Sequence, residues 1–465
     1  MIEPEALAAR LPQDFTIGVA MAAAQIEGAV AEGGRGVSTW DTFAAQPGRI
    51  IDGSTPAVAD DHFHRYRDDV ALMRELGVDA YRFSIAWPRI QPEGTGAANP
   101  EGLAFYDRLL DELLEAGISP VATIFHWDVP EPLQQAGGWM ARDTASRMAD
   151  LTTLLADAYG DRIDKWITLN EPTTVTLNGY ALGIHAPGES LLFDALTTVH
   201  HQLLGHGLSV QALRAGGVRG QVGVTNVHSP VVAAERGFMN AQFANVFDLV
   251  HNRIYADPVL LGRYPRFPFL ARKEFRALRE TDPADMAIIH QPLDFYGLNY
   301  YMPTRIALGA PTEVATPDGD AEAMRELPFH LAEWPEYPKT GFGWPISPEF
   351  LTASLRDYAK RYGSALPPVY ITEGGASFDD VVDSEGRVDD ASRTSYLADH
   401  IAAALDASDE VDLRGYFVWT LLDNWEWAAG FTQRFGFVHV DFDTLIRTPK
   451  SSFRWLQRVQ SSRRR

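Results

Sequence analysis

Eight short β-rich runs recur along the sequence, separated by helical patterns or long loops, and this alternation restricts the fold more than any other property. The runs cover residues 15–21, 79–85, 119–125, 165–169, 221–227, 293–299, 368–373 and 414–419. Strands that alternate with helices are typical of a parallel sheet, and eight such units favour closure into a barrel. We therefore predict an α/β fold: a single (β/α)8 TIM barrel with extended βα loops, spanning residues 1–465 as one domain.

Between these runs lie segments whose apolar residues recur at three- and four-residue spacing, the period of an amphipathic helix. They cover residues 66–76, 103–116, 144–158, 194–214 and 394–405. Gly77, Gly117 and Gly160 follow the first three segments and suit C-terminal caps. The stretch 302–343 is rich in Pro, Gly and acidic residues, contains Trp334 and is followed by Trp344. We predict that this irregular stretch forms one wall of a site entrance.

Polar or aromatic side chains stand at or just beyond the end of every predicted strand. They are Gln25, Glu27, Arg82, Ser84, His126, Trp127, Asp128, Asn170, Glu171, Asn226, Asn299, Tyr301, Glu373 and Trp419. In barrels of this kind, the working groups come from the carboxyl ends of the strands. The positions of these residues therefore predict an active site at that end of the barrel.

Two glutamates in this set have the placement of a catalytic pair. Glu171 follows the fourth run and Glu373 ends the seventh. Splitting a glycosidic bond needs two carboxyl groups in different protonation states: one protonates the leaving oxygen, and the other attacks the sugar carbon or activates a water. Either glutamate alone could be a helix cap or a turn residue. Together, with Arg82 and Tyr301 available to hold an ionised carboxylate, they predict glycoside hydrolysis.

A series of short motifs runs through the sequence in a fixed order. They are QIEGA at 25–29, YRFSIAWPRI at 81–90, HWD at 126–128, NEP at 170–172, GLNYY at 297–301, WTLLDNWEW at 419–427 and RTPK at 447–450. This series resembles glycoside hydrolase family 1, the β-glucosidases and their relatives. The resemblance implies a retaining β-glycosidase that removes terminal non-reducing β-D-glucosyl residues from a small β-glycoside or oligosaccharide. It also implies a part in cellulose degradation.

The same resemblance implies a role for each site residue. Glu171 is the acid/base and Glu373 the nucleophile, and their carboxyl groups should lie roughly 5–5.5 Å apart, as in retaining enzymes. Arg82, Asn299 and Tyr301 position the nucleophile region, with the Tyr301 hydroxyl bonded to Glu373. The other residues bind the substrate. The glycone hydroxyls are held by Gln25, His126, Asn170, Glu426 and Trp427, and Trp419 is the platform on which the sugar ring lies. Trp127 and Trp344 flank the pocket, with Trp344 on the aglycone side, and Phe435 also contacts the substrate.

The residue types fit this chemistry independently of the resemblance. Sugar hydroxyls both donate and accept hydrogen bonds, and the adjacent Glu426 and Trp427 supply an acceptor and a donor. The 11 Trp, 16 Tyr and 24 Phe are sufficient to line a site with rings. The His126-Trp127-Asp128 motif has no second ligand at metal-binding spacing, so we expect no metal and no cofactor.

Three positions depart from the usual family pattern. Gly374 stands where Asn normally follows the nucleophile. Because both residues tolerate a left-handed backbone, we expect the turn to persist while an amide side chain is lost. Ala24 stands where a bulkier ring is common and leaves extra room near the pocket, and Gln433 stands where lysine is frequent.

Other activities compete with this prediction. A 6-phospho-β-glycosidase has a serine, a lysine and a tyrosine where Glu426, Gln433 and Phe435 stand here, and a carboxylate opposes a phosphate. A plant-type thioglucosidase has glutamine at the position of Glu171. A sugar-binding pseudoenzyme would bind glucose without cleaving aryl β-glucosides, and the presence of both carboxylates argues against it. Activity on β-galactosides and β-fucosides and transglycosylation are plausible side reactions. The choice of aglycone, the leaving group of the substrate, is determined largely by the stretch 302–344.

Charge and cysteine content restrict partners and location. With 40 Lys and Arg against 62 Asp and Glu, the net charge of −22 repels nucleic acid and anionic membrane surfaces. No stretch reaches the roughly 18 apolar residues of a membrane helix, and the acidic start is unlike a signal peptide. The lack of cysteine is compatible with a reducing compartment, so we expect a cytoplasmic enzyme. We expect this enzyme to be either a monomer or a homo-oligomer.

Overall fold

The computed structural model describes residues 2–311, 313, 315–316 and 318–464, and within these ranges eight parallel strands close into a barrel. The barrel strands are β1 (Thr16–Met21), β2 (Ala80–Ser84), β3 (Ser119–Phe125), β4 (Lys165–Asn170), β5 (Gln221–Val227), β7 (Phe295–Asn299), β12 (Val369–Gly374) and β13 (Leu413–Trp419). They pair in chain order, and β13 closes the barrel against β1. Each strand overlaps one predicted run, so the predicted fold is confirmed.

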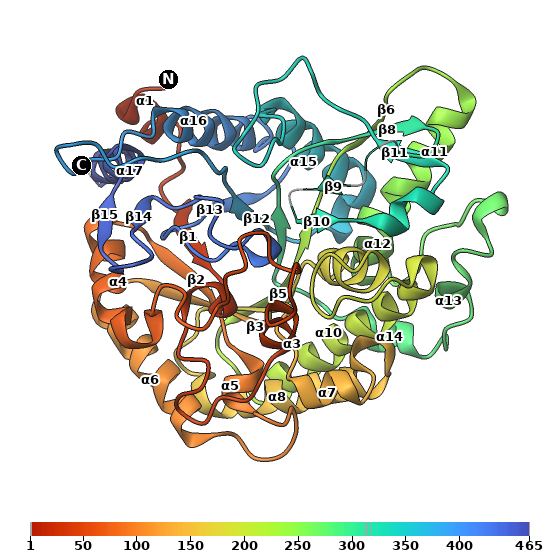
Figure 1. Cartoon of the computed structure of the whole chain (residues 1–465), viewed down its shortest axis with the longest axis horizontal. Coiled ribbons are helices and arrows are strands. Elements are labelled where there is room, and N and C mark those ends of the chain that lie inside the picture. The colour runs from red at the N-terminus through yellow and green to blue at the C-terminus, as the bar shows by residue number, and fades with distance from the viewer. Residues whose placement is uncertain (1, 312, 314, 317, 465) are drawn as a thin grey trace.

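Helices surround the barrel, as Figure 1 shows. The longer ones are α4 (His62–Leu76), α6 (Pro100–Glu115), α8 (Asp143–Tyr159), α10 (Thr197–Ala215), α11 (Phe238–Asp248), α12 (Ile254–Leu261), α15 (Pro348–Tyr362), α16 (Ala391–Leu405) and α17 (Ser451–Arg463). All five predicted amphipathic segments coincide with helices of this ring. In the part of the chain that the structure describes, no helix is long and apolar enough to cross a membrane.

Shorter elements connect these helices to the strands. The helices are α1 (Pro4–Ala8), α2 (Ala23–Ile26), α3 (Thr39–Ala44), α5 (Trp87–Ile90), α7 (Glu131–Gln135), α9 (Pro172–Thr174), α13 (Arg276–Arg279) and α14 (Asp285–Ile289), and the hairpin strands are β14 (Val438–Val440) and β15 (Arg447–Pro449). The amino-terminal α1 packs on α17 near the other end of the chain. The helices at the two ends of the chain therefore lie together on the same side of the barrel.

The apolar core has two parts, divided by the barrel wall. One cluster fills the space between strands and helices, and it includes Ile17, Leu109 and Leu355. The other runs through the barrel interior, where Phe295 and Phe417 lie. This inner cluster continues without a break into aromatic rings beyond the carboxyl ends of the strands. The floor of the predicted site is therefore part of the rigid core.

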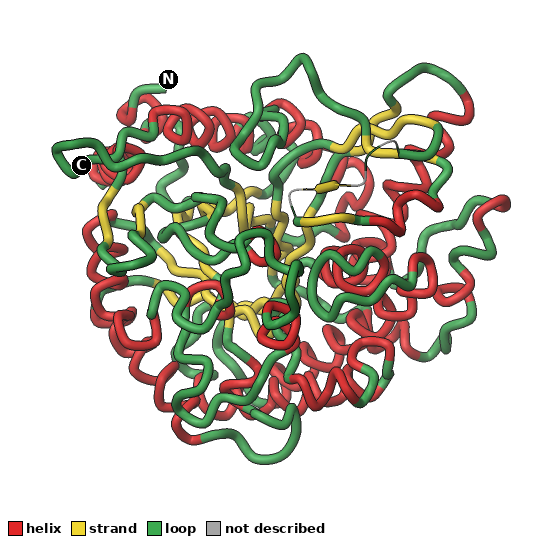
Figure 2. The backbone as a smooth tube through the Cα atoms, viewed as in Figure 1, coloured by secondary structure: helices red, strands yellow, loops and turns green. Residues whose placement is uncertain are grey.

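The stretch 302–343 is not irregular throughout, which corrects the prediction. Within it, β8 (Thr304–Leu308) and β11 (Phe329–Leu331) form a sheet with β6 (Val231–Ala233), a strand from the previous loop. A hairpin of β9 (Ala315–Thr316) and β10 (Gly319–Asp320) lies between them in sequence. Figure 2 shows this small sheet outside the barrel, at the upper right. The strands β6, β9, β10 and β11 have only two or three residues each, too few for a period to be recognised in sequence.

Two of the three predicted glycine caps have the expected conformation. Gly77 and Gly117 have φ of 80° and 72°, in the left-handed region that favours glycine. Gly160 follows α8 with φ of −60° and is not a left-handed cap. A Cβ at Gly160 would lie 2.5 Å from the carbonyl oxygen of Ala156, so the glycine is needed for close packing instead.

Candidate active site

A cavity of about 870 Å³ opens at the carboxyl ends of the barrel strands. Most of the predicted site residues line it: His126, Trp127, Glu171, Tyr301, Trp344, Glu373, Trp419, Glu426, Trp427 and Phe435. Gln25, Arg82, Asn170 and Asn299 are buried behind this lining and are bonded to it. The barrel thus brings both glutamates into one cavity, although their residues are distant in sequence.

Glu171 is held at the end of β4 in an environment that favours its neutral form. Its backbone has φ of 44°, an uncommon left-handed conformation for a residue with a side chain. One carboxyl oxygen accepts a bond from Asn299 Nδ2 at 2.6 Å, and the other accepts from Thr174 Oγ1 at 2.7 Å. Burial, followed by the charge of Glu373, raises the pKa of Glu171 to about 8 despite these two bonds.

Glu373, at the end of β12, has a donor at each of its two carboxyl oxygens. Arg82 Nη1 lies 2.6 Å from one carboxyl oxygen, and both side chains are buried. The Tyr301 hydroxyl donates to the other oxygen at 2.7 Å. Burial and the neighbouring carboxylates raise the pKa of Tyr301, so this phenol keeps its proton and stays a donor. The two glutamates therefore have different partners: an amide and a hydroxyl at Glu171, and a guanidinium and a phenol at Glu373.

Asn170 connects the surroundings of the two glutamates. Its Oδ1 accepts from Arg82 Nη2 at 2.6 Å and from Asn299 Nδ2 at 3.2 Å. Its Nδ2 lies 2.9 Å from His126 Nε2. Because that amide nitrogen can only donate, His126 accepts at Nε2 and carries its proton at Nδ1. Burial, then the charge of Arg82, lowers the pKa of His126 and keeps the ring neutral.

A third carboxyl group, Glu426, also lines the cavity. Gln25 Nε2 donates to it at 3.1 Å, while Gln25 Oε1 has no hydrogen-bond partner among the described residues. Burial, then the charge of Asp318, raises the pKa of Glu426 to about 8. Below that pH the group can donate as well as accept, and the adjacent Gln25 oxygen is an available acceptor.

Aromatic rings form the walls. Trp427 lies against Trp127 with ring centroids 4.5 Å apart. On the other side, Trp344 stacks on Phe342 at 4.6 Å and lies 5.4 Å from Tyr301. The half-buried Trp344 belongs to a group of packed aromatic rings that lines the cavity. The buried Trp419 lies between these walls at the end of β13.

Several residues in or next to the cavity lining escaped the sequence prediction. The Thr174 hydroxyl donates to Glu171 from one turn further along the chain. The three-residue spacing between the two residues was a signal from which this contact could have been predicted. Thr372, next to Glu373, donates to Asn299 Oδ1 at 2.8 Å and orients that amide. His185 and Asp318 also line the cavity, 3.4 Å apart. Since Asp318 lies in the turn between β9 and β10, no local pattern could have placed it there.

The positions that depart from the family pattern have specific surroundings. Gly374 is not in the left-handed region, so the expected turn is absent. Glycine is needed there because a Cβ would lie 2.3 Å from the Tyr416 hydroxyl. Gln433 accepts a bond from Ser377 Oγ at 2.8 Å. Ala24 is buried beside the site, and the extra room predicted there stays a prediction.

Comparison with known proteins places the chain in a family. The family model for glycosyl hydrolase family 1 matches residues 7–465. The chain belongs to glycosyl hydrolase family 1. This family 1 enzyme is 41% identical to β-glucosidase A of Thermotoga maritima, over 97% of each chain. It is 40% identical to a bifunctional β-D-glucosidase/β-D-fucosidase of Bifidobacterium breve, over 96% of this chain and 97% of the relative.

Solved structures of similar proteins agree with the fold of this family 1 enzyme. A psychrophilic β-glucosidase from Micrococcus antarcticus superposes with a TM-score of 0.93 at 40% identity, covering 100% of both chains. The T. maritima β-glucosidase in complex with glucoimidazole superposes with a TM-score of 0.89 at 40% identity, covering 97% of this chain and 99% of that one. These matches confirm the predicted family, the barrel and the glycoside hydrolase activity.

Proposed function

We propose that this family 1 enzyme is a retaining β-glucosidase that removes terminal non-reducing β-D-glucosyl residues by double displacement. The observation that carries the proposal is the contrast between two buried carboxyl groups in one cavity. Glu171 has a pKa raised to about 8 and is protonated at neutral pH. Glu373 is paired with Arg82 and accepts from Tyr301. An acid and a nucleophile are thereby prepared before substrate arrives.

In the first step, a carboxylate oxygen of Glu373 attacks the anomeric carbon, and Glu171 gives its proton to the departing oxygen. The product is a covalent glycosyl ester and a free alcohol. Ester formation removes the negative charge of Glu373, which is one cause of the raised pKa of Glu171. The pKa of Glu171 therefore falls in the intermediate, where the group must act as a base.

In the second step, the ionised Glu171 takes a proton from water as the water oxygen attacks the anomeric carbon. Glu373 leaves as a carboxylate, and the sugar departs with its original β configuration. An alcohol that replaces water in this step gives transglycosylation. Two inversions at one carbon need carboxyl groups roughly 5–5.5 Å apart, and this separation stays a prediction.

The glycone is proposed to lie between Trp419 and the polar group of Glu426, Gln25 and Trp427. Glucose is the first candidate, because the relatives are named β-glucosidases. The bifunctional relative from B. breve supports β-fucosides as further substrates. The phosphate of a 6-phosphoglycoside bound near Glu426 would face the carboxylates of Glu373 and Asp318, which opposes that substrate class. Residues 1–465 are proposed to form one catalytic domain, and the lack of cysteine supports the cytoplasm.

The test is proton NMR of 4-nitrophenyl β-D-glucoside hydrolysis, recorded before mutarotation mixes the anomers. We expect β-glucose first. α-Glucose first would mean inversion, and Glu373 would then not be the nucleophile. If no glucose is released from any β-glucoside, the protein is a sugar-binding pseudoenzyme and the proposal is wrong.

A further inference from the structure

The hydrogen bonds around Glu171 determine which of its two carboxyl oxygens carries the catalytic proton. Arg82 Nη2 can only donate, and it lies 2.6 Å from Asn170 Oδ1, so that atom of the amide is the oxygen. Asn299 presents its Nδ2 to this oxygen at 3.2 Å and to Glu171 Oε1 at 2.6 Å. Because a donor occupies Oε1, the proton of the neutral acid lies on Oε2.

The amide of Asn299 is also held at its other end. Thr372 Oγ1 donates to Asn299 Oδ1 at 2.8 Å and lies 3.2 Å from Thr225 Oγ1. All three side chains are buried, and they come from β5, β7 and β12. A flipped amide would turn its oxygen toward the oxygens of Asn170 and Glu171. The barrel therefore fixes Oε2 as the oxygen that gains and loses the proton.

Among the described residues, the one hydrogen-bond partner of Oε2 is the hydroxyl of Thr174, at 2.7 Å. We propose that Thr174 is a positioning residue for the acid/base: its hydroxyl holds Oε2 in place and stabilises the ionised form of Glu171 that the second step needs. The proposal rests on the double displacement proposed above. Thr174 keeps its own proton throughout, while the catalytic proton passes from Oε2 to the departing oxygen and returns to Oε2 from water.

The backbone brings the two side chains together. Glu171 stands immediately before α9, and the backbone N–H of Thr174 donates to its carbonyl oxygen at 3.0 Å, which forms the first helical turn. Pro172 at the first helical position favours this start. The chain continues directly into the π-helical segment η2 (Val175–Ala181). Because threonine is β-branched, few side-chain rotamers are open to it in such a turn, and the hydroxyl stays near Oε2.

The Thr174 hydroxyl does not serve the two protonation states of Glu171 equally. In the first step, Oε2 must give its proton to the departing oxygen and needs no donor. Once the proton has left, Oε2 belongs to a carboxylate, and the hydroxyl donates to it. Hydrogen bonds to an ionised group are roughly twice as strong as those between neutral groups. The hydroxyl therefore lowers the pKa of Glu171 and opposes the larger effect of burial, which raises it.

The charged and titratable groups around Glu171 come from other elements, and none of those described is hydrogen-bonded to Oε2. The charge of Glu373 on β12 raises the pKa of Glu171, and that of Arg82 on β2 lowers it. Burial raises the pKa of Tyr301 and lowers the pKa of His126 and His251, so these groups of the cavity stay neutral near pH 8. All of them are the same in wild type and in a Thr174 variant.

The experiment compares pH profiles of wild type, Thr174→Val and Thr174→Ser. Valine removes the hydroxyl and keeps the shape, whereas serine keeps the hydroxyl. The first profile, kcat/KM for methyl β-D-glucoside, reports the step in which Glu171 must be protonated. The second profile, kcat for 2,4-dinitrophenyl β-D-glucoside, reports the step in which it must be ionised.

In Thr174→Val, the ionised form of Glu171 has lost its donor, so its pKa rises. The alkaline limb of the first profile and the acidic limb of the second should therefore both move to higher pH, by about half to one unit. The acidic limb of the first profile does not depend on Glu171 and should stay in place. Thr174→Ser should keep the wild-type limbs, because it retains the hydroxyl.

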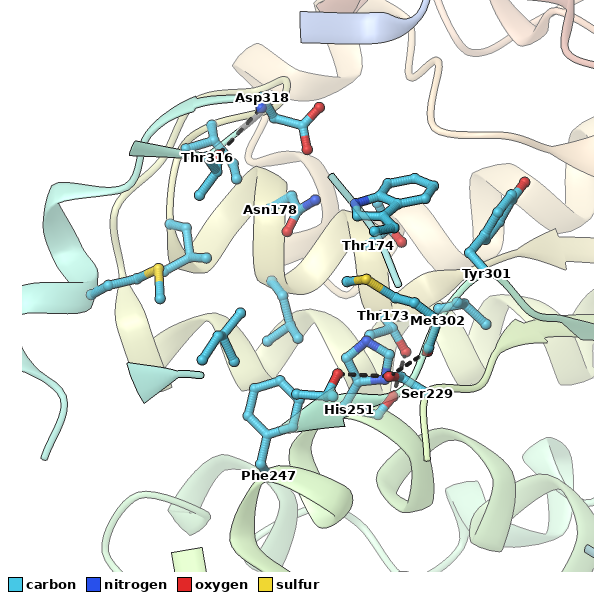
Figure 3. A pocket seen from close by; sticks show the side chains of 18 of the residues that line it. Thr173, Thr174, Asn178, Ser229, Phe247, His251, Tyr301, Met302, Thr316 and Asp318 are labelled. Atoms are coloured by element: carbon cyan, nitrogen blue, oxygen red, sulfur yellow. Dashed lines mark hydrogen bonds between the residues drawn. The ribbon is translucent and has the colours of Figure 1, made fainter. Parts of the chain in front are cut away.

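Thr173→Val is the matched control. Figure 3 shows both threonines in the lining of the cavity, but the Thr173 hydroxyl donates to the carbonyl oxygen of His251, at 2.9 Å, and not to Glu171. Its loss should move neither limb. Circular dichroism checks that each variant folds. If Thr174→Val does not fold, Thr174→Ala removes the same hydroxyl with a smaller side chain.

The outcomes separate this inference from the proposed function. Limbs that stay in place without the hydroxyl, or that move equally in Thr174→Ser, would overturn the role of Thr174 while hydrolysis by wild type upheld the β-glucosidase activity. Limbs that move to lower pH would overturn it too, because the hydroxyl would then stabilise the neutral acid. If wild type hydrolyses neither glucoside, both this inference and the proposed function are wrong.

Discussion

At the residue scale, identical side chains acquire opposite roles from their neighbours. Glu171 has amide and hydroxyl partners and a carboxylate nearby, whereas Glu373 has a guanidinium and a phenol. The motifs were enough to single out two glutamates that the barrel brings into one cavity. They could not show how strongly burial shifts the pKa of Glu171, because desolvation depends on residues from many parts of the chain.

The raised pKa of Glu171 predicts the alkaline limit of activity. An acid must be protonated to act, so kcat/KM for alkyl glucosides should fall tenfold per pH unit as pH rises above about 8. Glu171→Gln should lower kcat for these substrates by about 10²–10⁴-fold and remove this alkaline limb. 2,4-Dinitrophenyl glucoside, which needs little acid assistance to form the ester, is the control for the first step. A pH profile for alkyl glucosides that already declines near pH 5 would contradict the raised pKa.

The hydroxyl of Tyr301 gives a second residue-scale prediction. It donates to the Glu373 carboxylate at 2.7 Å, and hydrogen bonds to charged groups contribute about 1.5–3 kcal/mol. Tyr301→Phe should therefore lower kcat/KM roughly 10- to 100-fold while the melting temperature changes little.

Tyr300→Phe is the matched control for this variant. The Tyr300 hydroxyl donates to the Ser347 carbonyl oxygen at 2.8 Å, away from the carboxylates. Its loss should lower stability by about 1 kcal/mol and leave kcat/KM within about twofold of wild type. Equal kinetic losses in the two variants would mean that Tyr301 acts through folding rather than through Glu373.

At the element scale, long periodic segments were predictable and short pairings were not. The barrel strands and the amphipathic helices follow directly from their periods. Helix starts were the least accurate part: α6 begins at Pro100, where Asn99 caps it, and not at residue 103, whereas α10 begins at Thr197, after the predicted residue 194. The sheet of β6, β8 and β11 escaped prediction because its strands come from two loops that are separated in sequence by a barrel strand. Because this sheet supplies part of the cavity lining, the shape of that part could not be predicted either.

Gly374 gives a prediction about how β12 fits against β13. A Cβ at this position would lie 2.3 Å from the Tyr416 hydroxyl and 2.9 Å from its Cζ. Gly374→Ala should therefore lower stability by about 1–3 kcal/mol, because an overpacked core must shift. Its kcat should fall too, since the neighbouring Glu373 moves with the strand.

Removing the Tyr416 hydroxyl tests whether its closeness to a Cβ at position 374 explains the loss of stability. The double variant Gly374→Ala, Tyr416→Phe should recover part of the lost melting temperature, with Tyr416→Phe alone as the control. The recovery should be incomplete because Cζ remains close. If the double variant is no more stable than Gly374→Ala, the glycine is required for a reason other than this contact.

At the scale of the whole molecule, a buried ionic cluster joins the last barrel loops to the carboxyl-terminal helix. Lys450 Nζ lies 2.5 Å from Asp380 and 2.6 Å from Asp423, and all three side chains are buried. Arg393 on α16 lies 2.7 Å from Asp380 and 2.6 Å from Asp390. The RTPK motif marked Lys450 as a family residue, but only the closed barrel brings it to acids from two different loops. Lys450 therefore stabilises the packing of these two loops at the end of the barrel and does not contact the sugar.

This cluster predicts that the loss of Lys450 lowers the free energy of unfolding more than the loss of Arg454, a cation close to it in sequence. Lys450→Met should lower the free energy of unfolding by about 3 kcal/mol, because Asp380 and Asp423 each lose a buried partner while keeping an arginine. Arg454→Met is the matched control: Arg454 lies on α17, is 52% exposed and pairs with Glu75, so its loss should cost at most about 1 kcal/mol. Calorimetry and urea unfolding measure both. Since neither residue lines the cavity, kcat/KM at 25 °C should stay near wild type in Arg454→Met and in any folded Lys450→Met protein. Equal losses of stability in the two variants would show that the buried cluster does not hold the end of the barrel together.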